Sequence, residues 1–233
     1  MAFIAIFLLV DLLITLGAAY LYARFVWFYR DPVREPIKVE RAITSPADGQ
    51  IVYIKEFDET GGIYSEKLGK KIYLKELSDL PLALKKEGWI VGIYMSPFDV
   101  HFNYAPVNGK VEKIAYTKAK MNVPMVDLNE YIRISYLRQA FDNFAARFHL
   151  ENERNSLLLS GGDFPVGVVE IADKYVNKIS CFVEEGQELK PGDKIGFIDR
   201  GSQVDLIIFK KDIDFKVKFG EQVYGGKTVI AEY

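Results

Sequence analysis

Short apolar runs separated by turn residues dominate the chain beyond Ile43. Val, Ile, Tyr and Phe cluster in segments such as WIVGIYM and QVDLIIF, and Gly, Pro, Asn and Asp stand between them. β-Strands bounded by turns have this composition, whereas long stretches of helical periodicity are few. The pattern predicts a mainly β (α+β) domain, either a β-sandwich or a partly closed barrel of turn-strand units.

One continuous apolar stretch, Ala2 to Tyr22, precedes that domain. About 20 apolar residues suffice for a helix to cross a bilayer, and their insertion free energy outweighs a cost of about 3 kcal/mol for Asp11. The basic residues follow the stretch, which by the positive-inside rule places the C-terminal body on the cytoplasmic side of the cell membrane; they are Arg24, Arg30 and Arg34. We expect an uncleaved anchor at residues 1–24 and one domain at residues 25–233. A cleaved secretory signal is the alternative.

Two further patterns each have two interpretations. A 4, 3, 4 spacing predicts a helix whose apolar face either packs on the core or lies among lipid headgroups; its members are Leu137, Phe141, Phe144 and Phe148. Residues 45–54 (SPADGQIVYI) and 105–114 (APVNGKVEKI) share Pro, Asx, Gly and Ile in step. They are either equivalent turn-strand units or two copies of a common turn.

Composition narrows the class of function. Lys and Arg number 30 against 32 Asp and Glu, and a net charge of -2 provides no basic surface for nucleic acid, so no such partner is expected. The single cysteine, Cys181, can form neither a disulfide nor a cysteine-based zinc site, and no metal site is predicted. Its apolar neighbours indicate a buried strand position.

The candidate catalytic residues lie in loops and turns. His101, one of two histidines, follows a predicted strand in MSPFDVHFNYAP. Asp48 lies in the turn of SPADG, and Ser202 follows Gly201 in IDRGSQVDLIIF. Taken singly, Asp48 fits an Asx-turn and the Gly-Ser pair fits an ordinary turn. Taken together, the three side chains have the types required for an Asp-His-Ser relay.

Five motifs occur in a fixed order between Phe28 and Leu206: FYRDPVR, SPADGQIV, MSPFDVHFNYAPVNGKV, NERN and RGSQVDL. In this set and order the chain resembles the phosphatidylserine decarboxylase family, in the short form of bacteria and archaea. The resemblance implies a carboxy-lyase (EC 4.1.1 class) made as a zymogen and active in phospholipid biosynthesis. Its substrate would be a serine-headgroup phospholipid, phosphatidylserine or archaetidylserine, which becomes the ethanolamine lipid with release of CO2.

The same resemblance implies a covalent pyruvoyl cofactor derived from Ser202. Attack of Ser202 on the Gly201 carbonyl would split the chain into residues 1–201 and 202–233, which remain together as a heterodimer. His101 would act as the base and proton donor, oriented by Asp48. Longer relatives have a second histidine in this loop where the chain has Tyr104. The groups that could assist His101 are therefore Asn103, Tyr104 and His149.

Two questions stay open. Arg154 of NERN is either a bidentate ligand of the lipid phosphate or a member of a buried Arg-Glu pair. Residues 184–198 have the turn-rich pattern of biotinyl and lipoyl carrier domains, so the alternative function is a membrane-tethered, carrier-like β-sandwich adaptor without catalysis. That alternative predicts an intact chain. Neither homo-oligomer formation nor the choice between diacyl and ether lipid follows from the sequence.

Overall fold

The computed structural model describes residues 2–35, 37, 40–65, 68–80, 87–161, 163–174, 179–199 and 202–233. Gly201, the first half of the expected cleavage site, lies outside the described residues. The chain divides after Pro32 into two compact units, each of which is described by itself.

The first unit is helical. Helix α1 (Ala2–Tyr22) continues into a π-helical turn, η1 (Ala23–Trp27). Phe3–Trp27 is long and apolar enough to cross a membrane, with a mean hydropathy of 2.4 and no part of it buried. The predicted apolar helix is thus present, and it suggests membrane anchoring.

The second unit is built on an eight-stranded antiparallel sheet that curls into a half-barrel. The mainly β prediction is therefore confirmed. In spatial order the strands are β11 (Glu188–Leu189), β7 (Gly109–Thr117), β8 (Arg154–Gly161), β9 (Phe164–Ala172), β13 (Ser202–Ile208), β5 (Gly88–Met95), β2 (Gly49–Phe57) and β15 (Gln222–Val223). Strand β13 lies in the middle, paired along its whole length with β9 and β5.

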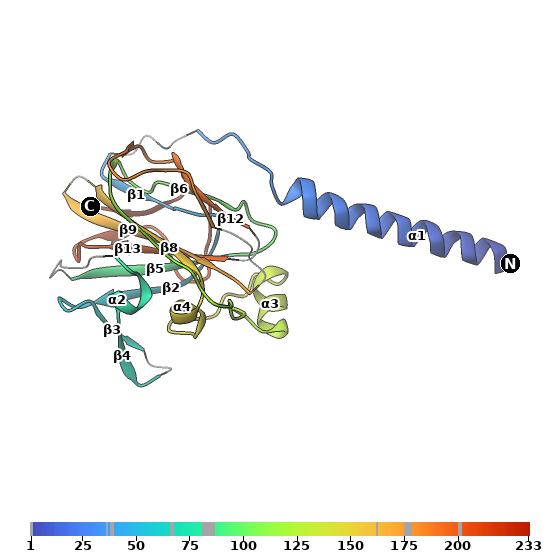
Figure 1. Cartoon of the computed structure of the whole chain (residues 1–233), viewed down its shortest axis with the longest axis horizontal. Helices are drawn as coiled ribbons and strands as arrows, with labels where there is room; N and C mark the ends of the chain where they lie inside the picture. The colour runs from blue at the N-terminus through green and yellow to red at the C-terminus, as the bar shows by residue number, and fades with distance from the viewer. Residues whose placement is uncertain are drawn as a thin grey trace. The chain divides into compact units, whose positions relative to one another are not determined.

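Smaller elements cover both faces of this sheet (Figure 1). On one face lie two three-stranded sheets. The first has the order β1 (Ala42–Thr44), β16 (Val229–Glu232), β14 (Asp214–Phe215). The second has the order β10 (Ile179–Cys181), β12 (Lys194–Ile198), β6 (Phe102–Tyr104). On the other lie the helices α2 (Leu74–Leu77), α3 (Leu128–Ser135) and α4 (Phe148–Glu151), and the hairpin β3 (Gly62–Ser65), β4 (Lys70–Tyr73).

Each face buries its own hydrophobic core. Alternate residues of a strand point to opposite faces, so β13 contributes Val204 and Leu206 to the core beneath the small sheets and Ile207 to the core beneath the helices. All seven residues of β13 are buried, and four of them are apolar. The other three, Ser202, Gln203 and Asp205, each form a hydrogen bond inside the fold. Ser202 shares the face of Val204 and therefore points toward the small sheets.

The two Pro-Asx-Gly segments are equivalent units. Each begins a nine-residue strand at its glycine, and each strand contains a bulge after the third residue. The turns also bond each other reciprocally: Tyr104 N donates to Pro46 O at 2.8 Å, and Thr44 N donates to Pro106 O at 2.9 Å. This pairing holds the SPADG turn against β6, the strand that follows His101.

Two predictions are wrong. No helix spans residues 137–148, because Arg138 and Ala145 adopt positive φ angles of 53° and 60°, which interrupt it. Phe144 is nevertheless buried in the core beneath the helices, as the packing interpretation requires. Cys181 does lie in a strand, but it is exposed, because β10 is a three-residue strand at the edge of its sheet.

Candidate active site

Ser202 is the first residue of the central strand β13. It pairs with Met95, the last residue of β5, on one side and with Ala172, the last residue of β9, on the other. Its side chain is fully buried, and its hydroxyl donates to Met95 Sδ at 3.2 Å. Thioether sulfur is a weak acceptor, so the hydroxyl is held in place without being strongly stabilised.

The loop after β5 brings His101 to the same end of the sheet. Ser96 N and Oγ donate to Asp99 Oδ2 at 2.8 and 2.6 Å, which closes a tight turn. The Asp99 carbonyl lies 3.0 Å from His101 Nδ1, and Ile198 N donates to His101 O at 3.2 Å. Because a carbonyl only accepts, Nδ1 of the neutral ring carries the proton and Nε2 has the lone pair that a general base needs.

Polar side chains line the same face of the sheet near Ser202. Asn103 Nδ2 lies 3.7 Å from Met95 Sδ. Glu170 faces the same side from β9, opposite Val204, and its Oε2 accepts from Asn155 Nδ2 at 2.8 Å. Among the described residues, Asn103 Oδ1 and Glu170 Oε1 have no hydrogen-bond partner. Burial raises the pKa of Glu170 to about 8, so this carboxyl is mostly protonated at neutral pH.

Asp48 is held by a cation and a backbone amide. Arg34 donates to both carboxylate oxygens, at 2.6 and 2.8 Å, and Gly225 N donates at 2.7 Å. The Arg34 guanidinium also lies 4.8 Å from the centre of the Tyr104 ring. The described partners of Asp48 are thus Arg34 and Gly225, whereas the described partner of His101 Nδ1 is the Asp99 carbonyl.

The NERN motif supports β8 and β9. Arg154 donates to both oxygens of Asp79, at 2.9 and 3.3 Å, and it also bonds the carbonyl of His149 at 3.3 Å. Its acidic partner is therefore Asp79 and not a glutamate. Asn152 Nδ2 donates to the Ala172 carbonyl at 2.7 Å, which fixes the end of β9 beside Ser202. These contacts indicate a structural role for the motif.

A second buried polar cluster, which the sequence did not reveal as a unit, lies on the opposite face of β13. Tyr53 Oη donates to Asp205 Oδ1 at 2.6 Å and lies 3.0 Å from His149 Nε2, while Gln203 Nε2 bonds Tyr53 Oη at 2.9 Å. Burial lowers the pKa of His149 to about 3 and raises that of Asp205 to about 7. His149 is therefore neutral and on the other side of the sheet from Ser202. No short motif links these positions in the sequence.

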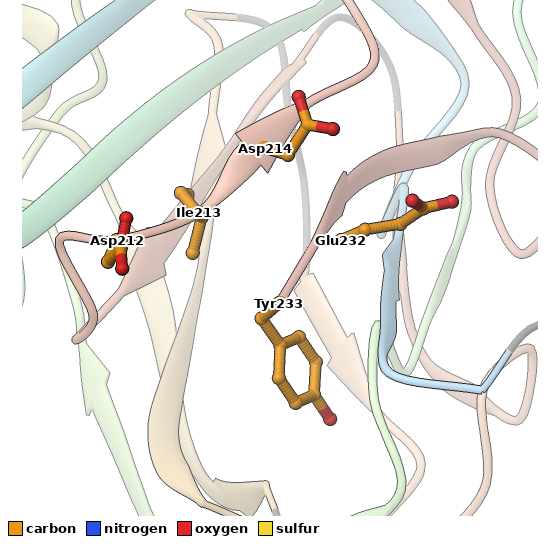
Figure 2. Close-up of a pocket in the computed structure, with 5 residues that line it drawn as sticks. All are labelled: Asp212, Ile213, Asp214, Glu232 and Tyr233. Atoms are coloured by element: carbon orange, nitrogen blue, oxygen red, sulfur yellow. The ribbon is translucent and has the colours of Figure 1, made fainter.

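A surface hollow of about 420 Å³ lies elsewhere, at the C-terminal end of the chain (Figure 2). Its lining residues are Asp212, Ile213, Asp214, Glu232 and Tyr233. Lys216 Nζ lies 2.7 Å from Asp214 Oδ2 and 2.8 Å from Glu232 Oε2, so two of the carboxylates are already paired. The hollow contains none of the candidate catalytic residues, and its acidic lining would repel an anionic headgroup.

Comparisons with known proteins define the class as a carboxy-lyase acting in phospholipid biosynthesis. The family model "Phosphatidylserine decarboxylase" matches residues 21–231. The chain belongs to this family, and the resemblance inferred from the five motifs is confirmed.

Curated relatives cover most of the chain. A "Putative archaetidylserine decarboxylase proenzyme" of Methanocaldococcus jannaschii is 35% identical over 206 residues, which are 88% of each chain. A "Phosphatidylserine decarboxylase proenzyme" of Magnetococcus marinus is 32% identical over 87% of this chain and 75% of the relative. A "Putative archaetidylserine decarboxylase proenzyme" of Methanothermobacter thermautotrophicus is 32% identical over 88% of this chain and 79% of the relative.

Proposed function

We propose that this chain is a proenzyme that cleaves its own Gly201-Ser202 bond and then decarboxylates a serine-headgroup phospholipid. The observation that carries the proposal is the position of Ser202 in a member of this family. A buried hydroxyl begins the central strand, at the end of the sheet where the His101 loop folds back.

Cleavage needs only the chain and one water molecule. Ser202 Oγ loses its proton to a base and attacks the Gly201 carbonyl carbon; the C–N bond breaks, leaving an ester and a free amine. A base then removes the α-proton of residue 202, and the Gly201 carboxylate departs. Water hydrolyses the resulting dehydroalanine and releases ammonia. The products are residues 1–201, ending in a carboxylate, and residues 202–233, beginning with a pyruvoyl group.

His101 and Asp48 have different roles in this scheme. His101 Nε2 is the base, because the Asp99 carbonyl holds the proton on Nδ1. Asp48 positions the loop: it fixes Arg34, which packs over Tyr104, three residues beyond His101.

The residues around Ser202 fit a pyruvoyl group. Asn103 Nδ2 and Ser202 Oγ both donate to Met95 Sδ, so an amide donor lies beside the position where the carbonyl oxygens of the group, which only accept, would form. When present, the group supplies a carbonyl that combines with the substrate amine and accepts the electron pair released with CO2. Met95 and Ala172 exclude water from its two sides, and His101 supplies the proton that the α-carbon takes up afterwards.

The family and the apolar helix both support a membrane lipid as the substrate. An enzyme whose chain carries a membrane-length helix meets its lipid at the bilayer, and the basic residues after α1 favour the cytoplasmic side of the cell membrane. Relatives are named for either the diacyl or the archaetidyl lipid. We propose one of these two serine lipids as the substrate.

Intact-mass measurement of the full chain tests the proposal. Wild-type protein should separate under denaturing conditions into residues 1–201 and 202–233, the latter beginning with a keto group. Ser202→Ala should stay whole, while the control Ser160→Ala, on the same sheet in β8, should split normally. A Ser202→Ala chain that still splits would remove Ser202 as the nucleophile. The release of CO2 from each serine lipid then identifies the substrate.

A further inference from the structure

Helix α3 presents apolar residues to solvent. Its first turn is fixed by a capping box in which Glu130 N donates to Asp127 Oδ1 at 2.8 Å and Asp127 N donates to Glu130 Oε2 at 3.0 Å. The helix buries Ile134, but an outward stripe at four-residue spacing is exposed. The exposed fractions are 76% for Leu128, 43% for Ile132 and 60% for Tyr136.

The stripe continues onto the loop that carries His101. The Phe98 ring packs edge-on against Tyr136, with ring centres 5.3 Å apart, and 43% of Phe98 is exposed. Leu137 is also exposed beside Tyr136. Isolated exposed apolar side chains are ordinary on soluble proteins, whereas an aligned group in contact indicates a binding surface. We call Phe98, Leu128, Ile132, Tyr136 and Leu137 the α3 surface.

The α3 surface is joined to the candidate active site through Asp99. Phe98 directly precedes Asp99, whose carbonyl lies 3.0 Å from His101 Nδ1. Arg138, which follows Leu137, places Nη1 3.7 Å from Asp99 Oδ2. Whatever contacts the surface therefore lies at the end of the sheet where Ser202 and His101 are located.

We propose that the α3 surface inserts into the headgroup region of the bilayer that holds the substrate. This inference rests on the lipid substrate of the proposed function. Apolar and aromatic side chains flanked by cations are the composition of an interfacial helix, and Arg133 and Arg138 flank the stripe. The proposal commits to lipid as the occupant, with phosphate groups near these arginines.

The apolar helix of the first unit provides a membrane anchor for the second unit. Phe3–Trp27 has the length and composition of a membrane span and is 0% buried. Residues 33–41 connect that unit to β1, and nine residues reach at most about 30 Å even when fully extended. A membrane-inserted α1 thus keeps the second unit within reach of the headgroups, where a weakly inserting surface suffices.

Spin labels on the full chain in vesicles of phosphatidylethanolamine and phosphatidylglycerol test the occupant. In a Cys181→Ser background, cysteine replaces Phe98, Tyr136 or, as a control, Tyr64, which is 59% exposed on strand β3. Labels at Phe98→Cys and Tyr136→Cys should collide with oxygen and be shielded from a water-soluble nickel chelate. The label at Tyr64→Cys should be open to the chelate.

Two other results would overturn the proposal. Labels at Phe98→Cys and Tyr136→Cys that are open to the nickel chelate would place the surface in water. Labels shielded from both reagents would show that protein covers it, either α1 or a second copy of the chain. These readouts do not depend on decarboxylation, so loss of the proposed function and loss of this surface are separate outcomes.

Kinetics provide a second measurement. Ile132→Asp should raise the apparent KM for serine lipid in vesicles by about tenfold or more, because one apolar side chain no longer inserts. Tyr64→Asp, the matched control, should leave that KM unchanged. An Ile132→Asp enzyme with wild-type KM would contradict insertion. A wild-type chain that releases no CO2 would instead contradict the proposed function, and the spin labels alone would then decide the role of the surface.

Discussion

The pair of Arg34 and Asp48 concentrates two charges in a site from which water is largely excluded. Only 9% of the Arg34 side chain and 5% of the Asp48 side chain are exposed. A buried ion pair contributes little net stability, because desolvation offsets the attraction, but removing one partner leaves an uncompensated charge. The guanidinium also packs on Tyr104, so the loss reaches the His101 loop.

We therefore expect Asp48→Asn to lower the free energy of unfolding by about 3–5 kcal/mol and to slow self-cleavage. The double variant Arg34→Met/Asp48→Asn should recover part of that stability, because no charge is left unpaired. Urea denaturation of the two variants and the wild type measures the difference. A single variant as stable as the wild type would contradict the structural role of the pair.

Glu170 makes stability depend on pH. Its pKa rises from 4.5 in the unfolded chain to about 8 in the fold because the carboxyl is buried. The stability it contributes is complete below pH 4.5 and is lost as pH rises toward 8, at up to about 1.4 kcal/mol per pH unit. Glu170→Gln should therefore show a flatter decline between pH 5 and 8. The pKa of His149 is lowered from 6.5 to about 3, so this residue makes the stability rise with pH over that range. Its contribution is the same in the wild type and in Glu170→Gln. Identical slopes would show that Glu170 is ionised in the native state.

At the scale of elements, strand β12 approaches strand β9 closely at a glycine, Gly196. A Cβ at Gly196 would lie 2.2 Å from Glu170 Oε1, and Gly196 pairs with Asn103 across the two small strands. Because Gly196 has no side chain, β12 can approach the large sheet closely. Strand β6 pairs with β12, so this approach also determines how close β6 lies to Ser202.

Gly196→Ala should therefore destabilise the protein by about 1–3 kcal/mol and slow self-cleavage by displacing β6. Shortening the opposing side chain in Gly196→Ala/Glu170→Ala should restore both. Gly17→Ala is the control, since no atom lies within 4 Å of the added Cβ. The thermal midpoint and the cleaved fraction with time are the measurements. An undisturbed Gly196→Ala would mean that the two strands do not pack this closely.

Most strands could be predicted from local sequence, because β-branched residues are frequent within the strands and turn residues separate them. The same reasoning failed between residues 137 and 148, where apolar spacing imitates a helix but Arg138 takes a positive φ. Phe144 lies in a loop but its side chain is buried in the core. The apolar spacing therefore indicated which residues are buried and did not indicate a helix.

The candidate site divides in the same way. Ser202, His101 and Asp48 could be selected as candidates because their residue types fit one reaction and their motifs resemble those of a family, and their catalytic roles stay predictions. Glu170 and Arg34 were not, because strand register and a contact between residues 14 positions apart place them, and no local pattern encodes either. The surface position of Cys181 likewise depends on which strand forms the edge.

At the scale of the whole molecule, the proposed cleavage divides one sheet between two chains. The C-terminal piece would contain β13. All seven residues of this strand are buried, and they pair with β9 on one side and β5 on the other. Both neighbours belong to the N-terminal piece. Removing β13 would expose the middle of both hydrophobic cores, so the two pieces cannot separate while the sheet stays folded.

We therefore expect the cleaved pieces to co-elute on size exclusion even in 1 M salt, because apolar contacts and ladder hydrogen bonds are little screened. They should separate only in denaturant, at the concentration where the far-ultraviolet circular dichroism of the sheet is lost. Unfolding should then depend on protein concentration for the cleaved form and not for Ser202→Ala, which remains one chain. Release of residues 202–233 under native conditions would mean that β13 is not the central strand of the mature enzyme.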